Sequence, residues 1–202
     1  MNEPNLDFIV KKHHLDDTGL TRHYLTLYSI ILGMESKNVF EFGAGFSTRS
    51  MIEALKLTGG KLTSVDMRTV ESRTTDFPPN FKNDNKDIWS FHNGNSLDVV
   101  PKLNHDKCYD VVLHDGSHTA ADVTKDLDNI APYVKSGGLV LIHDTTHHYL
   151  GLEMCYGVNN SKLVTDYKHD SSTLPYGYGL TIIRVLENPH NNERVEILWR
   201  KK

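Results

Sequence analysis

The apolar residues of the chain recur with two different periods, and the alternation of these periods predicts an α/β fold. Apolar residues spaced three and four apart predict helices, whereas short continuous apolar runs between turn residues predict buried strands. The helices expected from the spacing cover residues 22–32, 47–56, 97–103 and 119–134. The strands expected from the apolar runs cover residues 37–42, 61–66, 87–93, 109–115 and 139–143. Because strands and helices alternate through these units, we expect a doubly wound, mostly parallel sheet with helices on both faces.

The second half of the chain and one early segment are less regular. Two further strands, at 161–167 and 179–186, bring the expected sheet to seven strands, and the alternating piece 195–199 is either a strand or a tail. Gly137-Gly138 is expected to end the helix before the fifth strand. The polar stretch 68–86 holds two consecutive prolines and many Asn and Asp residues, so we expect a variable excursion without helix there.

The length, charge and cysteine count of the chain narrow its class. A chain of 202 residues without a repeat or a linker suits one domain. The parts of this domain are an N-terminal arm (1–20), a core (38–146), and C-terminal strands with substrate-side loops (147–202). The net charge of -4 lacks the basic excess typical of nucleic-acid binders, so no nucleic-acid partner is expected. No apolar run approaches the roughly 20 residues of a membrane helix, and residues 1–12 do not resemble a signal peptide. We therefore expect a cytoplasmic protein without membrane contact, and Cys108 and Cys155 are too few for a disulfide framework.

The glycine-rich turn after the first strand is the first candidate site. Gly43 and Gly45 allow positive φ angles and the close approach of a ligand to the backbone. The turn lacks the third glycine of a dinucleotide-binding Gly-x-Gly-x-x-Gly motif, because Thr48 stands at that position. Glu41 would disfavour a pyrophosphate but suits the cationic sulfonium of S-adenosylmethionine. Asp66 ends the second strand about 20 residues later, where an acid can bind a ribose diol. That spacing alone fits NAD equally well, and Glu41 favours the sulfonium cofactor.

Three segments resemble class I S-adenosylmethionine-dependent methyltransferases. Residues 39–48 resemble motif I of that family, Asp66 falls at its ribose-binding acid, and residues 92–101 resemble the segment after the third strand in small-molecule O-methyltransferases. The resemblance implies a Rossmann-like methyltransferase fold with residues 38–146 as the cofactor-binding core. The residues expected to bind the cofactor are Glu41, Gly43, Ala44, Gly45, Ser47, Asp66, Asn95, Ser96 and Asp115.

Two acidic motifs leave the same edge of the expected sheet. Asp115-Gly116-Ser117-His118 follows the fourth strand, and His143-Asp144 follows the fifth. Adjacent parallel strands lie about 4.8 Å apart, so Asp115 and Asp144 could converge on one divalent cation that lowers the pKa of a substrate hydroxyl. We expect catalytic roles for Asp115 and for His118, which could take the hydroxyl proton as an imidazole that titrates near neutrality. The alternative is that both aspartates cap the helices that follow them.

These motifs resemble the methyltransferase family that includes macrocin-type sugar O-methyltransferases and cephalosporin hydroxylase-like proteins. That resemblance implies metal ligation by Asp115, Asp144 and the residue at position 143. Position 143 is often Glu or Asp in metal-binding members but is His here, and histidine suits Zn²⁺, Mn²⁺ or Fe²⁺ better than Mg²⁺. In catechol-type relatives the third ligand would instead fall at Thr145. The identity of the metal and the need for one therefore stay open.

The combined prediction is a methyltransferase that uses S-adenosylmethionine, with or without a divalent cation such as Mg²⁺ or Mn²⁺, to methylate an oxygen of a small hydroxylated molecule. An NAD-dependent oxidoreductase on a related fold and a non-catalytic S-adenosylmethionine-binding protein are the alternatives, and a homodimer is left open.

Among the other histidines, His114 is expected to be structural, because it points to the other side of its strand from Asp115. His147 and His148 are either a solvated pair or part of the substrate mouth. Residues 176–179 form a tight turn that either shapes the substrate pocket or simply closes a hairpin.

Overall fold

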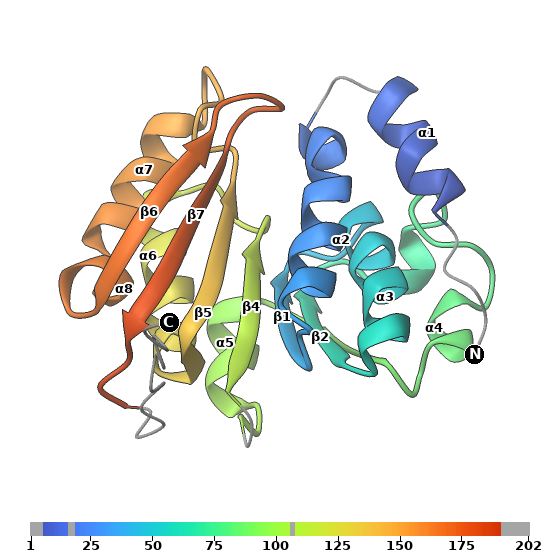
Figure 1. Ribbon diagram of the computed structural model, residues 1–202, viewed down its shortest axis with the longest axis horizontal. Helices are drawn as coiled ribbons and strands as arrows, with labels where there is room; N and C mark the ends of the chain where they lie inside the picture. The colour runs from blue at the N-terminus through green and yellow to red at the C-terminus, as the bar shows by residue number, and fades with distance from the viewer. Residues whose placement is uncertain (1–5, 16–18, 106–107, 191–202) are drawn as a thin grey trace, which may run out of the picture.

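A seven-stranded sheet with the strand order β3-β2-β1-β4-β5-β7-β6 forms the centre of the protein (Figure 1). The computed structural model describes residues 6–15, 19–105 and 108–190. The strands are β1 (Asn38–Phe42), β2 (Lys61–Asp66), β3 (Trp89–Asn93), β4 (Tyr109–His114), β5 (Val134–His143), β6 (Lys168–Leu174) and β7 (Leu180–Glu187). Strands β1 to β5 are parallel, whereas β7 runs antiparallel between β5 and β6. The predicted doubly wound, mostly parallel sheet is confirmed.

Helices cover both faces of this sheet (Figure 1). The helices are α1 (Asp7–Leu15), α2 (Tyr24–Gly33), α3 (Phe46–Thr58), α4 (Phe81–Asp84), α5 (Ser96–Val99), α6 (Ala120–Ile130), α7 (Gly151–Asn160) and α8 (Lys162–Thr165). Successive residues of a strand alternate between the faces, so Leu141 packs in the core under α1, α2 and α3, while Ile142 packs under α6, α7 and α8. Burial on both faces explains the short apolar runs at residues 111–113 of β4 and 139–142 of β5. No helix in the described ranges is long and apolar enough to span a bilayer.

The segment between β5 and β7 differs from the prediction. The strand predicted at 161–167 is wrong, because residues 162–165 form α8 and β6 begins only at Lys168. Leu163 is fully buried in the core beside α6. The apolar residues that suggested a strand here therefore face the core from a short helix. Helix α7 was not expected from the sequence. Strand β6 lies at the edge of the sheet with mostly exposed side chains, which leaves no apolar alternation to detect.

Smaller differences concern the ends of elements. Helix α6 stops at Ile130, and Gly137-Gly138 lies inside β5 rather than ending a helix. The N-terminal arm contains α1, and the polar excursion contains α4 and a 3-10 turn at Val70–Ser72, so helix is present where none was expected. The piece at 195–199 lies outside the described residues.

The carboxyl ends of β1 to β5 meet at one edge of the sheet, and a late hairpin reaches the same edge. Because β7 is antiparallel to β5, the β6–β7 loop at residues 175–179 lies beside the end of β5, where His143 pairs with Leu180. This edge therefore receives the loops after the first five strands and the loop of the last hairpin.

Candidate functional site

A cavity of about 900 Å³ opens at this edge, within the size range of small-molecule sites. Most residues expected at the site line it. They are Gly43, Ala44, Gly45, Ser47, Asp66, Asn95, Ser96, Asp115, His118, His143 and Asp144. Glu41 is not among the lining residues. The cavity therefore joins the expected cofactor segments and both acidic motifs in one space.

The glycine turn packs tightly against the end of β4. Gly43 has a φ of +81°, and a Cβ atom there would lie 2.3 Å from the backbone oxygen of Asp115. The Gly43 amide donates to Val65 (2.9 Å), and the Asp115 amide donates to the Phe42 carbonyl (3.0 Å). Position 43 therefore requires glycine both for its backbone conformation and for the close approach of the β4 loop.

Glu41 lies beneath the turn and is fully buried. Its carboxylate accepts hydrogen bonds from Ser47 Oγ (2.5 Å), Thr48 Oγ1 (2.7 Å) and Ser64 Oγ (2.8 Å). Burial raises the pKa of Glu41 to about 7, against the opposing effect of the three hydroxyl hydrogen bonds. Glu41 therefore ties the start of α3 to β2 and supports the turn from below, whereas the sequence placed it beside the sulfonium.

Asp66 ends β2 and accepts a hydrogen bond at each of its carboxylate oxygens. Its Oδ2 accepts from the Ala44 amide (2.9 Å) and from Arg73 Nη1 (2.6 Å), and its Oδ1 accepts from the Arg68 amide (2.7 Å). Arg73 also pairs through Nε with Asp76 (2.7 Å) and lines the cavity. Sequence reasoning missed Arg73, because it lies in the polar excursion without periodicity. The only local signal is the acid three residues later, a spacing that lets the two side chains meet.

Asn95 and Ser96 form the start of α5 at the end of the β3 loop. The Asn95 side chain accepts a hydrogen bond from the Leu97 amide (3.0 Å) and so caps this short helix. Both residues line the cavity, and the preceding Gly94 donates its amide to the Asp66 carbonyl (3.0 Å). The turn thus places polar groups beyond β3, next to the end of β2.

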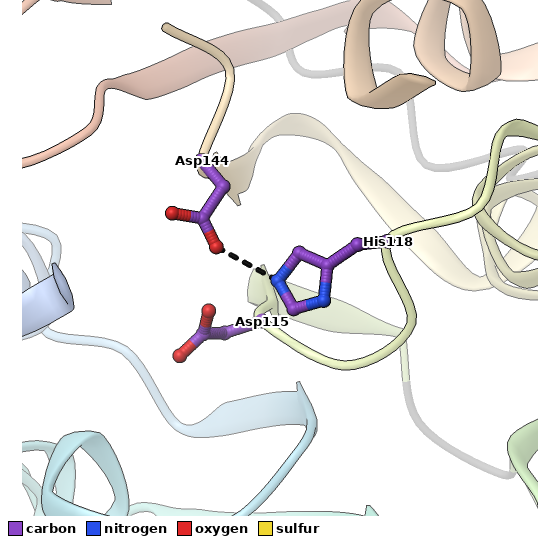
Figure 2. A group of neighbouring side chains, drawn as sticks. All are labelled: Asp115, His118 and Asp144. Carbon is purple, nitrogen blue, oxygen red and sulfur yellow. Dashed lines mark hydrogen bonds and ion pairs between the residues drawn. The ribbon is translucent and has the colours of Figure 1, made fainter. Parts of the chain in front are cut away.

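Three side chains from the two acidic motifs point toward one another (Figure 2). His118 Nε2 lies 2.7 Å from Asp144 Oδ2, and ligand atoms of Asp115, His118 and Asp144 all lie within 4.8 Å of one another, a group that could hold a metal ion. The hydrogen bond to Asp144 raises the pKa of His118 above its usual 6.5. Burial alone would raise the pKa of Asp144, but hydrogen bonds from His118 and His143 outweigh it and hold that pKa below its usual range.

The alternative role of the two aspartates, as caps of the helices that follow them, is not observed. Thr119 precedes α6 and caps it by accepting from the Asp122 amide (3.3 Å), and Leu150 precedes α7. Asp115 and Asp144 therefore present their carboxylates to the cavity.

His143 differs from the metal ligand suggested by the resemblance. Its Nδ1 lies 3.1 Å from Asp115 Oδ1 and 3.2 Å from Asp144 Oδ2, and its Nε2 lies 2.9 Å from the Gly177 carbonyl oxygen. Burial alone would lower the pKa of His143, but the bonds to the two carboxylates raise it to about 10. In the described part of the chain, the group able to hold an ion has His118 as its third member in place of His143.

The remaining candidates lie around this centre. His114 Nε2 bonds to Asp126 (3.1 Å) in the buried core, which confirms its structural role. Thr145 is also buried, and its hydroxyl accepts from Thr181 (2.9 Å). His147 lines the cavity and packs edge-on against Tyr178 at 4.3 Å between ring centroids, whereas His148 is exposed.

Comparison with known proteins agrees with this geometry. A family model described as a methyltransferase domain matches residues 40–145, and no curated protein matches the chain. The O-methyltransferase TomG from Streptomyces achromogenes in complex with SAM shares 15% identity and a TM-score of 0.64 over 93% of this chain and 91% of TomG. The SAH-bound methyltransferase PaMTH1 from Podospora anserina shares 14% identity and a TM-score of 0.64 over 93% and 89% of the two chains. A methyltransferase from Geobacter sulfurreducens shares 14% identity and a TM-score of 0.62 over 93% and 91%. At these identities the structural likenesses establish a common fold.

Proposed function

The chain belongs to the S-adenosylmethionine-dependent methyltransferases, and on that premise we propose that it methylates an oxygen of a small hydroxylated molecule. The observation that carries the proposal is the shared cavity, in which the glycine turn and Asp66 lie beside the His118–Asp144 pair. The family match supports methyl transfer over the nicotinamide-dependent alternative.

The cofactor end of the cavity is formed by the loops after β1, β2 and β3. We assign the ribose diol to Asp66 and the adenine to the turn at Asn95 and Ser96. The methionine part then lies along Gly43–Gly45, where the positive end of the α3 dipole favours its carboxylate. Glu41 contributes from beneath by holding Ser47 and the turn in place.

The acceptor end contains the His118–Asp144 pair. His118 is one-third exposed, and Asp144 holds its Nε2, which leaves Nδ1 to accept the hydroxyl proton of the acceptor. The acceptor oxygen then bonds to the methyl carbon as the bond from that carbon to sulfur breaks, which leaves S-adenosylhomocysteine. Asp144 stabilises the imidazolium that forms, and Asp115 orients the acceptor hydroxyl. Alignment of the two reactants and removal of one proton are the contributions that an in-line methyl transfer needs.

The divalent cation implied by the resemblance does not fit the ligand set Asp115, His143 and Asp144. His143 has both nitrogens engaged, one with two carboxylates and the other with a carbonyl, so it offers no lone pair. An ion held by Asp115, His118 and Asp144 would take the His118 nitrogen that bonds to Asp144 and would weaken His118 as a base. In the proposed reaction, His118 therefore takes the proton of the acceptor hydroxyl, and no step uses a metal ion.

Cofactor binding and methyl transfer test the proposal separately. S-adenosylmethionine should raise the melting temperature of the wild type, and Asp66→Ala should remove most of that rise, because it deletes the ribose acceptor. Asp98→Ala is the matched control, since Asp98 is an exposed acid of the nearby α5 outside the cavity.

Transfer of a labelled methyl group to a panel of hydroxylated acceptors tests the reaction. Absence of cofactor binding at millimolar concentration would refute the proposal. Cofactor binding without transfer to any sugar or aromatic acceptor would favour the non-catalytic alternative.

A further inference from the structure

The hydrogen-bond partners of His143 establish the charge of its ring. The Gly177 carbonyl oxygen, 2.9 Å from Nε2, can only accept, so Nε2 carries a proton. The carboxylates of Asp115 and Asp144, 3.1 and 3.2 Å from Nδ1, also accept, so Nδ1 carries a proton as well. Geometry alone therefore makes His143 an imidazolium, in a side chain that is 2% exposed.

A second histidine packs beside this cation in the opposite protonation state. His23 is fully buried, its Nε2 lies 2.8 Å from the Tyr176 carbonyl oxygen, and its Nδ1 has no hydrogen-bond partner. Nε2 donates to that carbonyl, and a second proton on Nδ1 would be a buried charge without an acceptor beside the His143 cation, so the ring is neutral. The two rings meet edge to face with 5.8 Å between their centroids. Burial and the charge of His143 lower the pKa of His23 to about 4, in agreement with this assignment.

The two histidines thus bond to neighbouring carbonyls of the loop at residues 175–179. Gly177, Tyr178 and Gly179 have φ angles of +58°, +66° and +87°, so three consecutive residues adopt left-handed conformations. Such conformations persist when surrounding contacts enforce them, particularly at the non-glycine Tyr178. The Tyr178 carbonyl accepts from the Thr146 amide (2.8 Å), and Tyr178 lines the cavity. The loop therefore brings a side chain to the acceptor end while histidines hold its backbone.

We propose that His143 is a positioning residue that fixes Asp115 and Asp144 side by side and ties both to the loop at residues 175–179. This inference rests on the proposed methyl transfer and deepens it. His143 supplies the positive charge between the two carboxylates that a divalent cation would otherwise supply. It follows that methyl transfer proceeds without an added metal ion. It also follows that the positions of Asp115 and Asp144 are coupled through His143 to the position of the loop at residues 175–179.

Two near-isosteric variants separate the two halves of this role. In His143→Asn the amide nitrogen can donate to the carboxylates in place of Nδ1, without its charge, but does not reach Gly177, so the carboxylates keep a donor and the loop is released. In His143→Gln the amide nitrogen can replace Nε2, so the loop stays held and the carboxylates are released. We expect His143→Asn to raise the acceptor KM and the amide hydrogen exchange of residues 175–179, with a smaller change in kcat. We expect His143→Gln to lower kcat on the order of 10- to 100-fold while loop exchange stays near that of the wild type.

A measurement on the unmodified protein does not depend on how the variants fold. Nitrogen-15 NMR of the histidine rings should show a doubly protonated ring for His143 and a ring protonated only at Nε2 for His23. Activity of the wild type should be unchanged after treatment with EDTA and unchanged by added Mn²⁺. A neutral His143, or activity that EDTA abolishes and Mn²⁺ restores, would overturn the inference. Identical loop exchange and kinetics in both variants and the wild type would also overturn it, while cofactor binding and methyl transfer by the wild type would leave the proposed function standing.

Discussion

The buried carboxylate of Glu41 leads to a quantitative prediction about stability. Glu41 sits under the glycine turn with no exposed surface and with three hydroxyl donors around it. Its pKa of about 7 in the folded protein lies well above the ordinary value of 4.5, because burial disfavours the charged form. The perturbation that isolates this effect is Glu41→Gln, which keeps the shape and a hydrogen-bonding oxygen but cannot ionise.

The direction in which stability changes with pH follows from the protons that Glu41 binds in the folded and unfolded states. Between pH 4.5 and about 7 the folded protein retains a proton on Glu41 that the unfolded chain has lost, so stability falls as pH rises through this window. The stabilising contribution is complete below pH 4.5 and lost above about pH 7. At about 1.4 kcal/mol for each unit of pKa, this displacement corresponds to roughly 3 kcal/mol. Replacing a protonated carboxyl by an amide changes the hydrogen bonds themselves by about 1 kcal/mol.

Urea unfolding of the cofactor-free protein, followed by circular dichroism at pH values from 5 to 8, measures this contribution. The difference in free energy of unfolding between Glu41→Gln and the wild type cancels the titration of all other groups. We expect that difference to move in favour of the variant by roughly 3 kcal/mol from pH 5 to pH 8. Glu187→Gln, which removes an exposed carboxylate from β7, controls for the loss of one negative charge. Parallel curves for Glu41→Gln and the wild type would refute the reasoning, and so would a difference that moves in the opposite direction.

Two further predictions concern the turn and the base. Gly43→Ala places a Cβ against the backbone of the β4 loop, so we expect a loss of about 2 kcal/mol or more in unfolding free energy and of the thermal shift caused by S-adenosylmethionine. Gly33→Ala is the control, because a Cβ at Gly33 meets no atom within 4 Å; a stable Gly43→Ala that binds cofactor normally would contradict the assignment. Since His118 must be neutral to accept a proton and its pKa is raised above 6.5, kcat/KM should fall as pH decreases through a midpoint above 6.5. A pH profile that His118→Asn leaves unchanged would remove His118 from the role of base.

The predictable part of the fold is the part buried on both faces. Strands β1, β4 and β5 lie between two layers of helices, so their buried residues form short apolar runs bounded by turns. Helix α7 lacks such a signal, because its sequence contains glycines and its outer side exposes Leu152 and Tyr156. Gly157 faces inward instead, where a Cβ would lie 2.6 Å from Val123. A helix that packs through a glycine and exposes large apolar residues reverses the pattern used to detect helices.

The candidate site divides in the same way. The glycine turn, Asp66 and the two acidic motifs follow strands directly, so their convergence could be predicted from the parallel topology. The partners of His143 could not, since one of its bonds reaches a backbone carbonyl 34 positions away in a loop of the last hairpin. Arg73 was equally hidden, because its bond to Asp66 depends on the path of a segment without periodicity. Backbone carbonyls and irregular loops carry no side-chain pattern.

The antiparallel insertion of β7 also orders the assembly of the protein in time. Translation proceeds from the N-terminus at about 5–20 residues per second, so the core that ends near Thr146 emerges roughly two to eight seconds before Glu187. When the chain has emerged to that point, it presents the glycine turn and Asp66, but the Gly177 carbonyl that pairs with His143 has not yet emerged. The cofactor half can therefore fold on the ribosome ahead of the acceptor half. The His143 ring can bond to the Gly177 carbonyl only after the last hairpin has formed.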